Sequence, residues 1–149
     1  MDFIFIILNF STLKLDKSLS ANLEKRKLSS LTPVQERAIP AILEGRDCLA
    51  IAPTGTGKTE AYAIPIIQRL RTKVTADRLS VLVLLPTREL CIQTQQRITN
   101  LIEGMDLIIA SFYGGGTYES QLDVYPTAHM ILATEASDDQ IHTFDKIRY

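Results

Sequence analysis

The sequence has little excess charge, few cysteines and no long hydrophobic run, and each absence excludes a class of protein. Its 16 basic and 17 acidic residues give a formal net charge of −1, so polyanion binding must come from a local site. The two cysteines, Cys48 and Cys91, cannot form a disulfide framework and match no metal-ligand spacing, which favours the cytoplasm or nucleus. The apolar run at residues 3–8 is far shorter than the roughly 20 residues of a membrane span, and it lacks the features of a signal peptide. Residues 1–9 are therefore interpreted as an apolar N-terminal extension, and no membrane partner is expected.

The length and the spacing of apolar residues predict one α/β domain. At 149 residues and 46% hydrophobic content, the chain can bury a core but is too short for two full α/β domains. Thr32, Pro33 and Gln35 are typical of a helix start, as N-cap, first helical residue and second half of a capping box, and Gly45 is typical of its end. Further helices are predicted at 59–70 and 89–102, and buried strands at 48–52, 81–85, 107–111 and 130–133. Buried strands that alternate with helices indicate parallel βαβ units in a three-layer αβα fold.

The strongest chemical signal is the segment APTGTGKT at residues 52–59, named here the phosphate loop. It lies between a predicted strand and a predicted helix, which is the context that a phosphate-binding loop requires. Gly55 and Gly57 allow backbone N–H groups to turn toward a phosphate, and the helix N-terminus adds partial positive charge. Lys58 would reach the β and γ phosphates, and the Thr59 hydroxyl would bind Mg²⁺. The alternative is an ordinary glycine-rich connection between a strand and a helix.

Together with its neighbours, the phosphate loop resembles motif I of the DEAD-box ATP-dependent RNA helicases, a family whose loop begins with alanine, as at Ala52. The segment LTPVQ at residues 31–35, followed by RAIP at 37–40, resembles the family's Q motif, with Phe10 at the position of its upstream aromatic residue. The resemblance implies a RecA-like domain that binds ATP and Mg²⁺, with Gln35 on the adenine edge and Phe10 against the base. The alternatives are a purely structural capping role for Gln35 and core packing for Phe10. The nucleotide-binding residues implied are Phe10, Gln35, Ala52, Thr54, Gly55, Thr56, Gly57, Lys58, Thr59 and Glu60, with Lys58 and Thr59 in the catalytic role.

The resemblance also implies contacts with the RNA backbone. The segment PTREL at residues 86–90 resembles motif Ia, and the glycines at 114–116 resemble the family's glycine-pair motif. A solvated arginine and a loose turn are the alternatives for these two segments. The family's Thr-Pro-Gly-Arg motif survives only as Thr134, because Glu135 and the residues after it depart from the pattern, so weak RNA binding is expected. The RNA-binding residues implied are Pro86, Thr87, Arg88, Gly115, Gly116 and Thr134.

The sequence contains no Asp-Glu-x-Asp, the family motif that holds Mg²⁺ and activates water, and no second RecA-like domain. Residues 10–149 are therefore interpreted as a partial first RecA-like domain that binds ATP and RNA but hydrolyses ATP poorly. In the family the missing strands lie beside the phosphate-loop strand, so residues 48–52 are expected to have an open edge. A non-catalytic nucleotide- or RNA-binding module, or a regulatory one, is the second interpretation. A kinase or GTPase is the third, and Gln35, Phe10 and the PTREL segment argue against it.

Overall fold

The computed structural model describes residues 9–72, 79–114 and 127–134. The chain divides into two compact units, which are treated separately below. The first unit comprises residues up to Val74 together with Arg97–Asp106, and the second comprises Thr75–Gln96 together with the residues from Leu107 onward. Helix α4 (Arg88–Leu101) contributes its beginning to the second unit and its end to the first.

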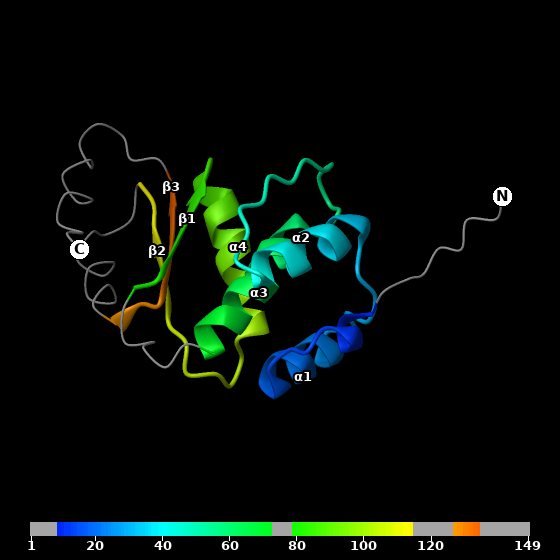
Figure 1. Cartoon of the computed structure of the whole chain (residues 1–149). Helices are drawn as coiled ribbons and strands as arrows, with labels where there is room; N and C mark the ends of the chain where they lie inside the picture. The colour runs from blue at the N-terminus through cyan, green and yellow to red at the C-terminus, as the bar shows by residue number, and fades with distance from the viewer. Residues whose placement is uncertain (1–8, 73–78, 115–126, 135–149) are drawn as a thin grey trace. The chain divides into compact units, whose positions relative to one another are not determined.

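The first unit is built from helices. A short 3-10 helix, η1 (Phe10–Thr12), precedes α1 (Lys17–Lys25), α2 (Pro33–Leu43) and α3 (Lys58–Thr72). Figure 1 shows α2 and α3 lying side by side. Together with α1 and the end of α4 they supply the apolar core of this unit, in which the largest fully buried residues are Leu19, Leu23, Ile39, Ile64, Ile67 and Ile98. The predicted helix starts are confirmed for α2, where the backbone N–H of Thr32 donates to Oε1 of Gln35 at 3.0 Å.

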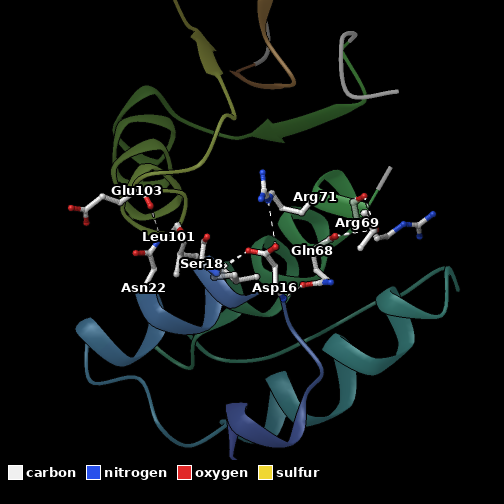
Figure 2. Close-up of polar contacts among 10 residues, drawn as sticks. Asp16, Ser18, Asn22, Gln68, Arg69, Arg71, Leu101 and Glu103 are labelled. Atoms are coloured by element: carbon white, nitrogen blue, oxygen red, sulfur yellow. Dashed lines mark hydrogen bonds and ion pairs between the residues drawn. The ribbon is translucent and has the colours of Figure 1, made fainter. Parts of the chain in front are cut away.

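Helix α1, which the apolar pattern did not predict, is fixed at its N-terminus by Asp16 (Figure 2). The Asp16 carboxylate accepts the backbone N–H of Ser18 at 2.9 Å, which satisfies one of the unpaired donors of the first turn. The backbone N–H of Asp16 donates to Oε1 of Gln68 at 2.6 Å, and Nε of Arg71 lies 3.6 Å from the same carboxylate. One cap residue therefore begins α1 and also attaches it to α3.

The other anchor of α1 is Asn22, a polar side chain that is only 8% exposed. Its amide nitrogen donates to the backbone carbonyls of Leu101 at 2.9 Å and Glu103 at 2.8 Å, as Figure 2 shows. These carbonyls lie at the end of α4, where the helix leaves acceptors without partners of its own. Lys25 and Arg26 add ion pairs to the Glu103 carboxylate at 2.7 and 2.9 Å. The C-terminal end of α4 is thus held to α1 by both neutral and charged hydrogen bonds.

The second unit contains a parallel sheet of three strands, β1 (Val81–Leu85), β2 (Ile109–Phe112) and β3 (Met130–Thr134), shown in Figure 1. The spatial order is β1-β3-β2, so the last of the described strands is the central one. Leu85 pairs with Thr134, and Phe112 pairs with Ala133. A small core forms around Ala110, Ala128, Ile131 and Ala133. The parallel pairing confirms the predicted α/β class.

The prediction that residues 81–85 form a strand buried on both faces is correct in position and wrong in burial. Leu82 and Leu84 are 50% and 65% exposed, while the three residues between and beside them are half-buried. Side chains alternate between the two faces of a strand, so the described residues cover one face of β1 and leave the other open.

The predicted buried strand at residues 48–52 is wrong. No strand forms there, and Leu49 and Ile51 are 90% and 91% exposed. A strand is stabilised when a neighbour satisfies its backbone donors and acceptors, and no segment within 9–72, 79–114 or 127–134 pairs with these residues. The segment therefore has the composition of a buried strand without a partner strand.

Two further predictions lie at the margins of the described residues. Of the proposed N-terminal extension, residues 1–8 fall outside them, and Asn9 forms an isolated antiparallel bridge with Ser30. The helices that the structure describes include none with the length and hydropathy needed to cross a bilayer.

Candidate functional site

The phosphate loop has the backbone geometry of an anion-binding turn. Gly55 and Gly57 adopt φ values of +79° and +85°, a region that side chains with a Cβ rarely occupy. Gly57 is the N-cap of α3, because its carbonyl accepts the first helical bond, from the N–H of Ala61 at 3.0 Å. The loop is therefore followed directly by α3, whose N-terminal N–H groups and helix dipole favour a bound negative charge.

Lys58 bends back onto the phosphate loop. Its Nζ donates to the carbonyl oxygens of Ala52 and, at 2.9 Å, Pro53. The hydroxyl of Thr56 donates to the same Pro53 carbonyl at 2.8 Å. These bonds close the loop on itself and keep the ammonium group, which is exposed, at the site where the sequence predicts phosphate binding.

The side chain of Gln35 joins α2 to the phosphate loop. Its Nε2 donates to the carbonyl oxygen of Gly57 at 3.1 Å, while its Oε1 accepts the Thr32 N–H. Gln35 is 4% exposed, and each end of its amide keeps a second hydrogen-bonding position. The structure thus brings together two residues that the sequence assigns to nucleotide binding, through a contact that the sequence analysis did not predict.

The first turn of α3 carries three more of the predicted nucleotide-binding residues besides Gly57. Lys58 begins the helix, the half-buried Thr59 follows it, and Glu60 forms an ion pair with Nη1 of Arg97 at 3.1 Å. The Glu60 side chain is 14% exposed, and an acidic group in the first turn interacts favourably with the helix dipole. The structure therefore places the Glu60 carboxylate against Arg97, while the predicted Thr54 is exposed in the loop.

Phe10 lies apart from the phosphate loop among the described contacts. It is 5% exposed, its backbone N–H donates to Ser29 at 3.1 Å, and it lines a cavity of about 180 Å³ together with Leu23 and Glu24. A larger cavity of about 540 Å³ is lined by the first turns of α2, residues 48–53 and Thr56, without Phe10 or Gln35. Phe10 is therefore buried in the first unit, and its contact with a nucleotide base stays a prediction.

The predicted RNA-binding residues of the second unit share one edge of its sheet. Leu85 and Thr134 are register partners at the ends of β1 and β3, and β2 ends at Phe112 beside Ala133. Because the carboxyl ends of parallel strands meet at one edge, the segments 86–88 and 113–114 leave the sheet there with Thr134. Gly115 and Gly116 lie outside the described residues.

At this edge Arg88 begins α4, and its guanidinium carbon lies 4.9 Å from the centre of the Tyr113 ring. The Thr87 hydroxyl accepts the N–H of Leu90 at 3.2 Å and so acts as the N-cap of the helix. Pro86 and Arg88 are exposed.

The phosphate loop has the space for a polyphosphate, but it lacks a set of side chains that could hold a metal ion without the phosphates. A Cβ on Gly55 would meet nothing within 4 Å, so the loop has open space beside its backbone. In the described ranges, no three His, Cys, Asp or Glu side chains gather in a group able to hold a metal ion. Thr59 is therefore the sole predicted Mg²⁺ ligand, and any magnesium would need further oxygen ligands from the phosphates and water.

Comparison with known proteins gives one consistent result. Residues 32–149 match a family model described as DEAD/DEAH box helicase. The chain is 35% identical over 128 residues to the DEAD-box ATP-dependent RNA helicase CshA of Streptococcus pneumoniae, an alignment that covers 85% of this chain and 24% of the relative. It is 41% identical over 123 residues to the ATP-dependent RNA helicase SrmB of Escherichia coli, covering 80% and 27%.

Among solved structures, a DEAD box protein from Methanococcus jannaschii is similar with a TM-score of 0.78 and 30% identity, over 87% of this chain and 35% of that one. This likeness confirms the predicted RecA-like fold class. The chain spans about a quarter of the length of the curated relatives named above.

Proposed function

The chain belongs to the DEAD/DEAH box helicase family, and on this premise we propose that it forms the ATP- and RNA-binding part of an ATP-dependent RNA helicase. The family predicted from the motifs is thereby confirmed, whereas the activity and the roles of single residues are proposals. The observation that carries the proposal is the phosphate loop, with two glycines at positive φ, a lysine beside its carbonyls and a helix N-terminus at its end.

In the nucleotide complex, Lys58 gives up its bonds to the loop carbonyls and donates instead to the β and γ phosphates. The backbone N–H groups of residues 54–57 would bind the phosphates, and the Thr59 hydroxyl would supply one ligand to Mg²⁺. When bound, Mg²⁺ neutralises charge on the phosphate oxygens. Gln35 would offer a donor and an acceptor to the adenine edge. The contact of Phe10 with the base, which the resemblance implies, would require this buried side chain to move.

RNA binding is assigned to the carboxyl edge of the sheet, at the segment Pro86–Arg88 and Thr134. Gly115 and Gly116 complete the set of RNA-binding residues that the resemblance implies. Arg88 is the cation of this group, and a guanidinium presents a planar fork of donors that suits a phosphate. The contact is with the RNA backbone and is expected to be weak and independent of base sequence.

Hydrolysis of ATP needs more groups than binding of ATP does. Phosphoryl transfer needs an oriented water and cations on the transition state in addition to bound phosphates, and the sequence contains no Asp-Glu-x-Asp. We therefore propose that the 149-residue polypeptide binds ATP without hydrolysing it at a useful rate. The same observation favours a second candidate function, a non-catalytic nucleotide- or RNA-binding module acting in the cytoplasm or nucleus.

The test is equilibrium binding of a fluorescent ATP analogue with Mg²⁺ present. Lys58→Ala is expected to weaken binding at least about tenfold, since it removes charge-assisted hydrogen bonds to phosphate. Lys17→Ala, which removes an exposed lysine of α1, is the matched control and should bind as the unaltered chain does. Equal affinity for Lys58→Ala would contradict nucleotide binding by this loop. RNA-stimulated phosphate release that Lys58→Ala abolishes would contradict the absence of hydrolysis.

A further inference from the structure

The first residue of helix α4 is a cation, Arg88, which packs on the ring of Tyr113. Arg88 is the first residue of the helix, where the positive end of the dipole disfavours a cation. Within the described ranges no carboxylate lies within 4 Å of the Arg88 guanidinium. The guanidinium carbon instead lies over the face of Tyr113, 4.9 Å from the ring centre.

The contact with Tyr113 has a useful chemical property. The face of an aromatic ring carries partial negative charge and attracts a cation, but it does not pair with the N–H donors of the guanidinium as a carboxylate does. An arginine that packs on a ring therefore keeps an uncompensated charge and free N–H donors. In an arginine paired with Asp or Glu, the carboxylate neutralises the charge and occupies the donors.

The two residues also reach this place from different strands. Arg88 follows β1 after Pro86 and Thr87, and Tyr113 directly follows β2. β3 lies between these strands in the sheet, so the pair spans the carboxyl edge above the central strand. The ring that contacts Arg88 is thus supplied by the segment that follows a different strand of the sheet.

From these observations we infer that Tyr113 is a positioning residue for RNA, which holds the Arg88 guanidinium in the orientation that binds a backbone phosphate. The inference rests on the proposed function, because it assumes that Arg88 contacts RNA. Tyr113 belongs to none of the motifs on which the sequence resemblance depends. It acts through Arg88 and needs its ring face rather than its hydroxyl.

The experiment measures binding of a fluorescein-labelled single-stranded oligoribonucleotide by the full chain, at several salt concentrations. Arg88→Ala should weaken binding and reduce the slope of log affinity against log salt by about 0.7, the share of one phosphate contact with a single strand. Tyr113→Leu should weaken binding about two- to fivefold at a fixed salt concentration, the range of an exposed cation–π contact. Tyr113→Phe keeps the ring and should bind as the unaltered chain does.

The decisive variant combines Arg88→Ala with Tyr113→Leu. If Tyr113 acts through Arg88, then Tyr113→Leu has no effect in the Arg88→Ala background, because the group that it positions is gone. Loss of a merely structural residue would weaken binding in both backgrounds. Tyr113→Met, which keeps bulk without an aromatic face, gives the same comparison if Tyr113→Leu lowers the melting temperature.

The possible failures are distinguishable. If the unaltered chain does not bind the oligonucleotide, or if Arg88→Ala binds as well as the unaltered chain, the proposed RNA contact is wrong and the inference falls with it. If Arg88→Ala weakens binding but the leucine and methionine variants of Tyr113 do not, the proposed function stands and the positioning role is wrong. Equal effects of Tyr113→Leu in both backgrounds lead to that same conclusion.

Discussion

The amide nitrogen of Gln35 donates to the carbonyl oxygen of Gly57 at 3.1 Å, and the two residues lie so close that a Cβ on residue 57 would displace the Gln35 side chain. A Cβ built on Gly57 would lie 2.3 Å from that nitrogen. One side chain therefore completes the capping box of α2 and also fixes the path of the phosphate loop. The positive φ of Gly57 and this contact both disfavour a side chain at the second glycine of the loop.

Gly57→Ala is expected to destabilise the first unit through two effects, a left-handed backbone and a steric conflict. Gly104→Ala is the matched control, because Gly104 has φ +74° and no atom within 4 Å of an added Cβ. Gly104→Ala should lower the free energy of unfolding by about 1–2 kcal/mol through backbone strain alone. Gly57→Ala should lower it by about 1–3 kcal/mol more, because the added Cβ overpacks the site. Chemical denaturation without nucleotide measures both. Equal losses would show that the Gln35 contact imposes no steric constraint.

The attachment of α1 to the end of α4 should depend on pH. Hydrogen bonds from Lys25 and Arg26 lower the pKa of Glu103 below the ordinary range of a glutamate. A carboxyl whose pKa is lower in the folded state stabilises the fold above its unfolded pKa, and this contribution is lost as pH falls through the folded value. Glu103→Gln should therefore lower the melting temperature near pH 7, and the difference should shrink toward about pH 3.

Glu24→Gln is the control for this measurement, because Glu24 is exposed on α1 and forms no ion pair with the residues described. It should leave the melting temperature unchanged at both pH values. A difference between Glu103→Gln and the unaltered chain that persists at low pH would contradict the charge-based explanation.

The two cysteines should react at very different rates. Cys48 is exposed, whereas Cys91 is fully buried in α4 and its burial raises the pKa of the thiol. Because the thiolate is the reactive form, alkylation at neutral pH should modify Cys48 at least about ten times faster. Mass spectrometry of the Cys48→Ser and Cys91→Ser variants separates the two sites. A protected Cys48 would mean that residues 48–52 are covered after all.

The exposed apolar residues of the segment 48–52 should promote self-association of the chain. Replacing both Leu49 and Ile51 by lysine removes two large exposed side chains from a segment that has no described partner strand. Light scattering should show less aggregation, while the stability should change by no more than about 0.5 kcal/mol per site. Ile64→Lys, at a fully buried position of α3, is the contrasting variant and should prevent folding. Loss of stability in the double lysine variant would show that the segment is packed.

Much of the fold could be predicted from local patterns. The capping residues and apolar period of α2 and the apolar run of β1 fix these elements from neighbouring residues alone. Helix α1 was missed although Asp16, Leu19 and Leu23 carry an N-cap and a four-residue apolar spacing. The prediction for residues 48–52 failed because burial depends on a partner strand, which the composition of a segment does not reveal.

In the candidate site, too, local patterns could be predicted from the sequence and contacts between distant residues could not. The phosphate loop could be found because its glycines, lysine and threonine are consecutive in the sequence. The contacts that hold it, Gln35 with Gly57 and Glu60 with Arg97, join residues 22 and 37 positions apart. Such contacts depend on how helices pack, and no short motif encodes them.

The strand order has a consequence for the synthesis of the chain on the ribosome. β3 is central in the described sheet but last in sequence, so β1 and β2 cannot take their places until Met130–Thr134 has been translated. Helices α2 and α3, which adjoin along the chain, need no such delay. During this interval β1 is already made and keeps the apolar residues Leu82 and Leu84 without the neighbour that will align them. Translation speed between residues 85 and 130 thus sets how long an unpaired hydrophobic strand is available to chaperones.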